Sequence, residues 1–302
     1  MADPGRSVLL DGSSLMYRAF FSVPPTVRSA DGRPINALHG FLDMVARLIE
    51  SRRPTQVVTV YDHDWRPAPR VAMYAGYKAK RPPDPEGLPE QFGMLREVLD
   101  ALGLPQAEAE GWEAEDAIGS ISAQAPNDER FDIITGDRDL IQLVRDPWVR
   151  VLFTLKGVTD LRVLDEAGVL EKYGVPASRY ADFATLRGDP SDGLPGVHGV
   201  GEKTARTLVL AYPDLPSLVA DASSPTRTGA PLQRSPSLRA AIREAGPYLE
   251  IMRSVVPIRT DLDVIRWQAD PDPDLLAKLA DQYRVTGPVR RLSEALAGTL
   301  GA

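Results

Sequence analysis

Two aspartates stand at alternate positions directly after an apolar run. In FDIITGDRDLIQL, residues 131–143, Thr135 and Gly136 are followed by Asp137 and Asp139. Aspartate is a good helix N-cap and suits turns, so Asp137 capping a following helix explains one of the two. Like charges this close repel unless a positive charge lies between them. On this motif alone, capping and metal binding are equally good explanations.

Further acids gather in four other short segments. GWEAEDAIG, residues 111–119, has three acids within four residues, which is more than a favourable helix start requires. LRGDPSDGLPG, residues 186–196, has two, although these residue types also suit an ordinary turn. With the aspartates that end two apolar runs, LLD and VYD, the set comprises Asp11, Asp62, Glu113, Glu115, Asp116, Asp137, Asp139, Asp189 and Asp192.

A ligand set made of carboxylate oxygens favours Mg²⁺ or Mn²⁺. The chain has no cysteine and three scattered histidines, which excludes disulfides, thiolate catalysis and zinc-type sites. A set this large suits two ions, and two metals about 4 Å apart stabilise the attacking and leaving oxygens of a phosphodiester displacement. The acids therefore predict phosphodiester cleavage without a side-chain nucleophile.

Alternating strands and helices must position these acids. Three apolar runs read as short buried strands, each followed by Asp11, Asp62 or Asp137: residues 7–10, 55–61 and 131–135. Helical patterns cover 36–51, 88–102 and 113–124. This order predicts an α/β fold with a mainly parallel central sheet flanked by helices. Ligands of such sheets bind beyond the carboxyl ends of the strands, where the three aspartates converge.

Residues 63–90, here called the arch segment, cannot form a regular core element because they are rich in proline, basic residues and aromatics. Long excursions of this kind are usually functional or disordered. A linker is the plain alternative. Function is favoured by the mix of Tyr74, Tyr77, Lys78, Lys80 and Arg81.

A glycine-rich turn runs into a helix at GLPGVHGVGEKTAR, residues 193–206. Glycines let a backbone approach a phosphate closely, and the amides of a helix start attract it. This is a helix-hairpin-helix type of sequence, which binds nucleic-acid backbone without reading bases. Its expected DNA contacts are Gly196, Gly199, Gly201, Lys203 and Thr204. Beyond residue 165 the pattern is mostly helical, with a flexible loop expected over 221–236.

Bulk composition fits a soluble globular protein of one large domain or two ordinary ones: 302 residues, 43% hydrophobic and 25% charged. The sequence predicts no transmembrane helix and no secretory signal, so a cytoplasmic location is expected. The formal net charge of −7 argues weakly against nucleic-acid binding. Without the nine clustered acids, however, the net charge becomes +2.

In combination, seven motifs resemble the flap endonuclease and 5′-3′ exonuclease family, in particular the 5′ nuclease domain of bacterial DNA polymerase I: LLDGSS, VVTVYD, YKAKRPP, GWEAED, ITGDRDLIQL, GDPSDGLPG and GVGEKTA. The resemblance covers residues 6–300 and implies a free-standing enzyme. It implies a PIN-like nuclease core over 1–185 with a helical arch at 63–90. It also implies a mostly helical region over 186–302, with the DNA-binding helix-hairpin-helix at about 186–212.

The resemblance also implies roles for single residues. Asp11, Asp62, Glu113 and Glu115 would surround a first metal, Asp137, Asp139, Asp189 and Asp192 a second, with Asp116 between. Tyr17 would stack on the base beside the scissile phosphate, although an ordinary packing role is its alternative. Lys78 and Arg81 would steady that phosphate, with Arg18 and Arg70 as further cations. The hairpin at 196–203 would hold duplex DNA and a K⁺ ion.

The implied activity is removal of 5′ flaps and RNA primers from DNA that has a single-stranded 5′ end. A separate DNA polymerase I is the expected functional partner, and the protein is expected to be a monomer associated with the nucleoid. Two alternatives stay open. One is a paralogue that grips branched DNA without cutting it, although such relatives usually lose several carboxylates. The other is a toxin-type ribonuclease, although those chains are shorter and lack arch and hairpin.

Overall fold

A computed structural model gives the fold and describes residues 5–126, 128–156, 158, 160–225 and 231–299. Its centre is a seven-stranded sheet in the order β6-β5-β4-β1-β2-β3-β7. The strands are β1 (Ser7–Asp11), β2 (Gln56–Tyr61), β3 (Gln106–Glu108), β4 (Phe131–Thr135), β5 (Val149–Lys156), β6 (Asp160–Leu164) and β7 (Ile265–Trp267). The five central strands are parallel, and β6 and β7 pair antiparallel at the two edges. The predicted mainly parallel sheet is confirmed.

The helices of the first half are α1 (Gly12–Ser22), α2 (Asn36–Arg52), α3 (Ala68–Met73), α4 (Leu88–Ala101) and α5 (Ala114–Gln124). Those of the second half are α6 (Glu166–Tyr173), α7 (Tyr180–Arg187), α8 (Glu202–Ala211), α9 (Leu215–Ser223), α10 (Pro236–Glu244), α11 (Gly246–Val255), α12 (Pro273–Gln282) and α13 (Thr286–Ala297). The predicted helices over 36–51, 88–102 and 113–124 correspond to α2, α4 and α5. Of the loop expected over 221–236, residues 226–230 lie outside the described ranges, and residues 231–234 form a 3₁₀ helix.

The sheet separates two apolar cores. Successive residues of a strand point to opposite faces, so Leu9 and Ile133 join the core that contains α5, whereas Leu10 and Ile134 join the core that contains α1 and α2. Strands buried on both faces read as continuous apolar runs, which explains the LL and II pairs in the sequence.

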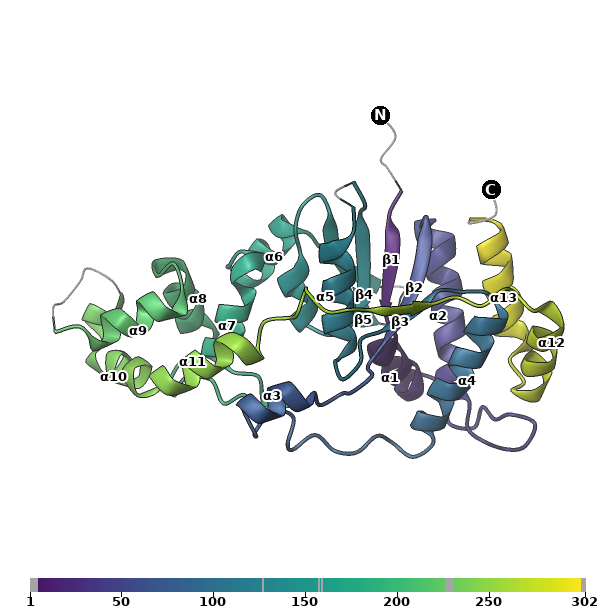
Figure 1. Cartoon of the computed structure of the whole chain (residues 1–302), viewed down its shortest axis with the longest axis horizontal. Helices are drawn as coiled ribbons and strands as arrows, with labels where there is room; N and C mark the ends of the chain where they lie inside the picture. Colours follow the sequence, from purple (N-terminus) through teal and green to yellow (C-terminus); the bar gives the residue numbers. More distant parts are fainter. Residues whose placement is uncertain (1–4, 127, 157, 159, 226–230, 300–302) are drawn as a thin grey trace.

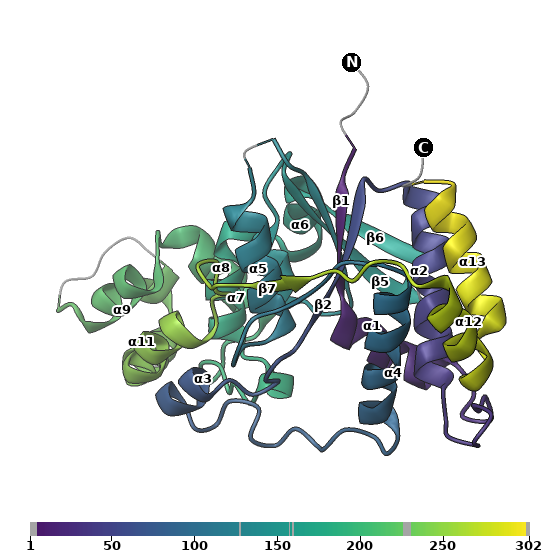
Figure 2. The same ribbon diagram turned by 45° about the vertical axis from the view of Figure 1, so that its right-hand side comes forward.

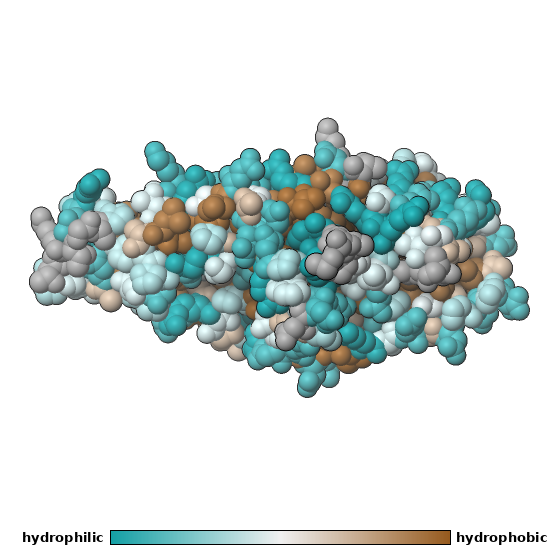
Figure 3. Space-filling view, turned by 90° about the horizontal axis from the view of Figure 1, so that it is seen from above, coloured by the Kyte–Doolittle hydropathy of each residue, from teal (hydrophilic) through white to brown (hydrophobic). Residues whose placement is uncertain are grey.

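The second-half helices lie at two ends of the molecule (Figure 1). Helices α8 to α11 form a lobe at one end. From there, the chain crosses the molecule through β7, and α12 and α13 pack against α4 and α2 (Figure 2). Residues 186–302 therefore form a separate lobe and also contribute two helices, α12 and α13, that pack on the outside of the nuclease core. From above, the molecule is elongated, with a mostly hydrophilic surface interrupted by apolar patches (Figure 3).

The arch segment runs as a strap along the bottom of the molecule in Figure 1, from α3 to α4. The expectation of a helical arch holds for α3 alone; residues 74–87 form turns and extended chain. Prolines at 82, 83 and 85 explain this, because proline has no backbone N–H for a helix and disfavours helical geometry in the residue before it. Within the described ranges, no helix is long and apolar enough to cross a membrane.

Candidate active site

Asp11 is fixed at the point where β1 ends and α1 begins. Its Oδ1 accepts a hydrogen bond from the Ser14 amide at 3.0 Å and so caps α1. Its Oδ2 accepts one from the Thr135 hydroxyl at 2.6 Å, which ties it to the end of β4. Burial raises the pKa of Asp11 to about 7, despite these two hydrogen bonds. A nearby cation would restore its charge.

Asp62 follows β2 and links the sheet to α5. Its Oδ1 accepts a hydrogen bond from the Ala114 amide at 2.7 Å, at the helix start. Its own amide donates to the Ser13 hydroxyl at 3.3 Å. The helix start also carries Glu113 and Glu115, so this bond places the acids of α5 beside those of the sheet.

Asp137 and Asp139 follow β4 in a tight turn. The Asp137 amide donates to the Thr135 hydroxyl at 2.8 Å, and Asp137 Oδ1 accepts from the Asp139 amide at 2.9 Å. The helix expected after Asp137 is a 3₁₀ helix, Asp139–Leu143, without a side-chain cap at its N-cap residue Arg138. One oxygen each of Glu115, Asp137 and Asp139 lie within 4.8 Å of one another. Burial and the Asp137 charge raise the pKa of Asp139 well above its usual value.

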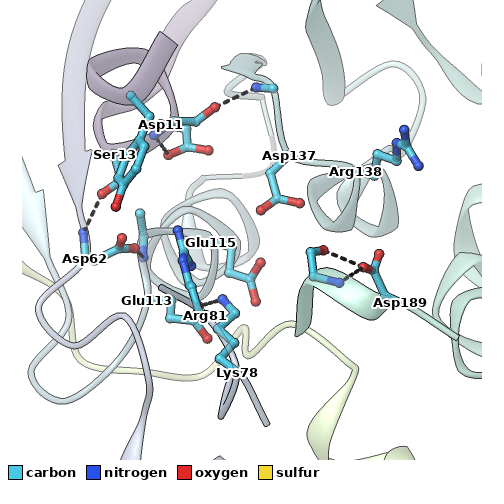
Figure 4. Close-up of a pocket in the computed structure, with 15 residues that line it drawn as sticks. Asp11, Ser13, Asp62, Lys78, Arg81, Glu113, Glu115, Asp137, Arg138 and Asp189 are labelled. Carbon is cyan, nitrogen blue, oxygen red and sulfur yellow. Dashed lines mark hydrogen bonds and ion pairs between the residues drawn. The ribbon is translucent and has the colours of Figure 1, made fainter. Parts of the chain in front are cut away.

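These acids open into a cavity of about 460 Å³, here called the acid cavity. In Figure 4, the carboxylates of Asp137 and Glu115 face its centre, Asp189 lies at its edge, and Arg138 points away. Six of the nine predicted acids line it: Asp11, Asp62, Glu113, Glu115, Asp137 and Asp189. Asp139 lies just behind, in contact range of Glu115 and Asp137. The structure therefore brings the predicted acids together.

A buried group of donors neutralises Glu113 and Asp116. Glu113 accepts hydrogen bonds from Arg70 Nη1 and the Tyr77 hydroxyl, both at 2.6 Å, and from Lys78 Nζ. Arg70 also holds both oxygens of Asp116 at 2.8 Å. Burial alone would lower the pKa of Lys78, but the neighbouring acids raise it overall, so Lys78 carries its charge.

This arrangement differs from what the sequence suggested for three residues. The side chains of Arg70 and Tyr77 are 1% and 2% exposed, and Asp116 is fully buried. DNA therefore cannot touch Arg70 or Tyr77 in this conformation, and Asp116 has its oxygens occupied by Arg70 and by the Arg259 amide at 2.9 Å. The sequence could not reveal this, because the arch segment's path over α5 is set by tertiary packing.

Of the other predicted cations, Arg81 lies at the edge of the acid cavity. The guanidinium of Arg81 lies 5.9 Å from the centre of the Tyr17 ring, and both residues line the cavity. Lys80 is exposed. Arg18 is partly buried, and its Nη2 donates to the Thr154 carbonyl at 3.0 Å. The Tyr17 hydroxyl bonds to Asp84, which ties α1 to the arch segment.

Asp192 joins the arch segment to the loop after α7. The Lys78 amide donates to the Asp192 carbonyl at 2.9 Å, and Lys78 Nζ lies 3.7 Å from its carboxylate. Burial raises the pKa of Asp192 to about 6. Asp189 caps the short 3₁₀ helix here by accepting from the Ser191 amide at 3.0 Å.

The glycine-rich turn connects α7 to α8 as a helix-hairpin-helix. Gly196 has a φ of +67°, and a Cβ there would lie 2.6 Å from the Arg187 carbonyl, so glycine is required. Val197 is buried and anchors the turn. Gly199, Gly201 and Lys203 are exposed, and Thr204 at the start of α8 is partly exposed. The turn thus presents backbone and one cation to solvent.

Three contributors were not singled out from the sequence. Ser13 and Ser14 line the acid cavity, and Thr135 orients Asp11 and Asp137. Their position in the sequence could have indicated them, because each stands within three residues of an aspartate at a strand end.

Without metal, the protein is expected to lose stability as pH rises. The folded-state pKa of Asp11 lies near 7, above an unfolded value of about 4. The folded state therefore binds the proton more tightly, so the stabilisation is complete below pH about 4 and is lost as pH rises to about 7. In EDTA, the free energy of unfolding by urea should fall by about 2 kcal/mol between pH about 5 and about 7.5. Asp11→Asn should weaken this dependence without abolishing it, because burial also raises the pKa of Asp139 and of Asp192; a constant or rising wild-type stability would contradict the prediction.

Comparisons with known proteins agree with this geometry. Residues 6–174 match the family described as the 5′-3′ exonuclease, N-terminal resolvase-like domain, and residues 175–271 match the 5′-3′ exonuclease, C-terminal SAM fold. The chain belongs to the 5′-3′ exonuclease family.

Among its relatives, a 5′-3′ exonuclease of Streptomyces coelicolor is 43% identical over 94% of this chain and 98% of that protein. A 5′-3′ exonuclease of Mycobacterium tuberculosis is 40% identical over 96% of this chain and 97% of that protein. A DNA polymerase I of Mycobacterium leprae is 38% identical over 96% of this chain, which spans 31% of that protein.

Solved structures share the fold at lower identity. The T5 D15 protein, co-crystallised with metal ions, has a TM-score of 0.65 at 15% identity and covers 98% of this chain and 99% of its own. Human GEN1 in complex with Holliday junction DNA has a TM-score of 0.65 at 18% identity. The match covers 97% of this chain and 71% of the GEN1 chain.

Proposed function

We propose that this chain is a structure-specific 5′ nuclease that hydrolyses DNA phosphodiester bonds at the acid cavity, as a 5′-3′ exonuclease and a 5′-flap endonuclease. One observation carries this proposal. The carboxylates of Glu115, Asp137 and Asp139 approach within 4.8 Å at an open cavity whose edge carries Arg81 and Tyr17. Carboxylates this close together at an open cavity suit metal-dependent attack on DNA.

The donor set fits Mg²⁺ or Mn²⁺. It consists of carboxylate oxygens, the ligands that hard cations prefer. Burial raises the pKa of Asp11 and Asp139, and neighbouring carboxylates raise both further, so a cation bound here would stabilise the ionised forms. When bound, such ions would lower the pKa of water and stabilise charge on the phosphate oxygens. The residues that would hold them are Asp11, Asp62, Glu115, Asp137, Asp139, Asp189 and Asp192. Glu113 would join them by exchanging its bond to Lys78 for the ion, which would free the Lys78 ammonium for the phosphate. Asp116 serves instead to position Arg70.

Tyr17 and the cations near the acid cavity other than Arg70 act on DNA directly. The exposed Arg81 guanidinium and the Lys78 ammonium steady the scissile phosphate, and the Tyr17 ring stacks on the adjoining base. Lys80 and Arg18 attract the backbone nearby. The 5′ strand passes beneath the arch segment after the terminal base pairs open, which costs a few kcal/mol. Arg70 and Tyr77 contribute by holding Glu113 in place.

The helix-hairpin-helix holds the duplex portion. Its glycines bring backbone amides to a phosphate, and its carbonyls bind K⁺. Lys203→Ala is expected to weaken binding about equally on all sequences and to reduce the slope of log affinity against log salt by about 1. Lys278→Ala, on α12 at the other end of the molecule, is the matched control and should leave the slope unchanged. Equal slopes for all three proteins would exclude this role.

The cellular role we propose is removal of flaps and RNA primers in replication and repair. The protein would act as a monomer at the nucleoid in the cytoplasm, in sequence with a separate DNA polymerase I. The link to DNA polymerase I is supported by the Mycobacterium leprae relative of that name, in which one segment is similar to 96% of this chain.

The proposal is tested with a 5′-flap duplex labelled at both ends, compared with blunt and single-stranded DNA. We expect cleavage near the flap junction, with 5′-phosphate and 3′-hydroxyl products, and inhibition when the flap's 5′ end is blocked by a bulky protein. Cleavage of single strands at random positions would contradict structure specificity. The rate of trimming from blunt ends, relative to the rate of flap cleavage, would measure the exonuclease activity.

A further inference from the structure

The arch segment and the helix-hairpin-helix contact each other directly. The Lys78 amide donates to the Asp192 carbonyl at 2.9 Å. Gly76 packs so closely on Gly193 that a Cβ on Gly193 would overlap the Gly76 carbonyl oxygen. In the proposed function, the arch segment steadies the phosphate that is cut, and the hairpin holds the duplex. The junction between these two segments therefore determines how far apart the two DNA contacts lie.

A cavity of about 520 Å³ lies within this junction. It is lined by residues 74–80 of the arch segment on one side and by residues 187–195, which lead into the hairpin, on the other. Because the two segments face each other across this space, their relative position depends on the side chains that join them at its border. Tyr74 lies at that border.

Tyr248 on α11 contacts the hairpin through its hydroxyl. The oxygen accepts a hydrogen bond from the Gly196 amide at 3.2 Å, and the hydroxyl donates to the Thr185 carbonyl at 3.4 Å. Thr185 belongs to α7, the first helix of the hairpin, and Gly196 belongs to its turn. Burial raises the pKa of Tyr248 to about 12, so the hydroxyl keeps its proton and can donate. A single hydroxyl thus bridges the helix and the turn.

Tyr74 makes the connection from the arch segment. Its ring and the Tyr248 ring lie 6.4 Å apart between centroids at an interplanar angle of 72°, an edge-to-face arrangement that aromatic pairs favour. Its hydroxyl donates to the Gly193 carbonyl at 3.4 Å. Helices α3 and α11, next to which these tyrosines lie, are neighbours in Figure 1. The arch segment, the turn and α11 meet at these two residues, here called the tyrosine pair.

We propose that the tyrosine pair determines which bond is cut: by joining the arch segment to the hairpin, Tyr74 and Tyr248 fix the distance between the bound duplex and the phosphate at the acid cavity. This inference rests on the proposed function. Both are positioning residues, because neither lines the acid cavity. A displacement of about 1 Å can slow a reaction by about 10²-fold. A loose junction would therefore slow cleavage and spread it over neighbouring bonds.

The first test maps the cut in a 5′-flap duplex at single-nucleotide resolution. Tyr248→Leu removes the ring contact and the hydroxyl bridge. It should cut about 10-fold more slowly at saturating substrate and at several adjacent bonds, with little change in KM because the exposed hairpin backbone still holds the duplex. Tyr248→Phe keeps the ring contact and should cut at the wild-type bond.

A double variant and a control separate positioning from general damage. Tyr74→Leu combined with Tyr248→Leu should be no slower than the slower single variant, because both remove the same contact. Tyr283→Phe removes a tyrosine hydroxyl that donates to Glu97 at 2.6 Å, between α12 and α4, and should cut as the wild type does. Additive losses in the double variant would mean that the two tyrosines act independently and would overturn the inference.

The second test needs no cleavage. Hydrogen exchange in EDTA, without DNA, should be about 5-fold faster at the Lys78 amide in Tyr248→Leu than in the wild type, because the lost aromatic contact eases local opening. Exchange in α13 should be unchanged. Equal exchange at Lys78, or a single cut at the wild-type bond by Tyr248→Leu, would overturn the inference. Faster exchange in a protein whose wild type cuts no flap with any metal would show that the pair joins the segments and would contradict the proposed function instead.

Discussion

Asp137→Ala is expected to slow cleavage of a 5′-flap duplex by about 10³-fold while the duplex still binds. Asp137 faces the centre of the acid cavity beside Glu115 and Asp139. Charge stabilisation by metal is worth several kcal/mol in such reactions, and each 1.4 kcal/mol is a factor of about 10 in rate. Binding should persist because the hairpin and the arch segment hold the DNA, and Asp137 itself repels phosphate.

Asp137→Asn separates charge from structure in this experiment. In the wild type, Asp137 Oδ1 accepts a hydrogen bond from the Asp139 amide at 2.9 Å. Asparagine retains a side-chain oxygen that can accept the same hydrogen bond. The turn should survive while the ligand charge is lost, so both variants should cut about 10³-fold more slowly than the wild type. Asp270→Ala, an exposed acid far along the chain, is the matched control with normal cleavage. Normal cleavage by Asp137→Asn would show that its charge is not required and would remove Asp137 from the site.

Arg70→Met is expected to cost about 3–5 kcal/mol of folding stability. Arg70 is a buried cation that contacts Glu113 and Asp116 at 2.6 to 2.8 Å and Glu115 at 3.1 Å, and removing it leaves these acids uncompensated. Its Nε also donates to the Val255 carbonyl at 3.0 Å, which ties α3 to the end of α11. The loss is measured as the shift in free energy of unfolding by urea.

Two comparisons identify the cause of that loss. The deficit of Arg70→Met should shrink as pH falls, because protonation neutralises the three acids that Arg70 otherwise balances. Arg253→Met removes an exposed ion pair with Glu250 and should cost at most about 1 kcal/mol. A deficit independent of pH would mean that Arg70 stabilises by packing rather than by charge.

The sequence predicted those parts of the site that depend on local pattern. Asp11, Asp62 and Asp137 stand at strand ends, where the alternation of strands and helices alone places them at one edge of the sheet. Four strands were not predicted: β3, β5, β6 and β7. β3 and β7 have three residues each and β6 is largely exposed, so none of these has a long buried apolar run, and β5 interrupts its apolar residues with Arg150 and Thr154. The return of α12 and α13 to the core was missed for a similar reason, since helical periodicity does not specify a partner.

The burial of Arg70 and Lys78 could not be read from the sequence. A basic, proline-rich segment predicts an exposed loop, and Lys80 and Arg81 fulfil that expectation. Lys78, two residues earlier, is 5% exposed because the chain folds its side chain onto Glu113 and Asp192. Such alternation between buried and exposed cations arises from contacts across long sequence separations, which local patterns do not record.

The most direct test of the central claim, a metal-dependent nuclease centre at the acid cavity, is a single-turnover assay on a bound 5′-flap duplex. The enzyme is first saturated with DNA in EDTA, and Mg²⁺ or Mn²⁺ is then added in excess. We predict binding without cutting in EDTA and prompt cleavage near the junction once metal is added. Tight binding without cleavage in any metal would contradict the claim and would identify the chain as a non-catalytic binder of branched DNA.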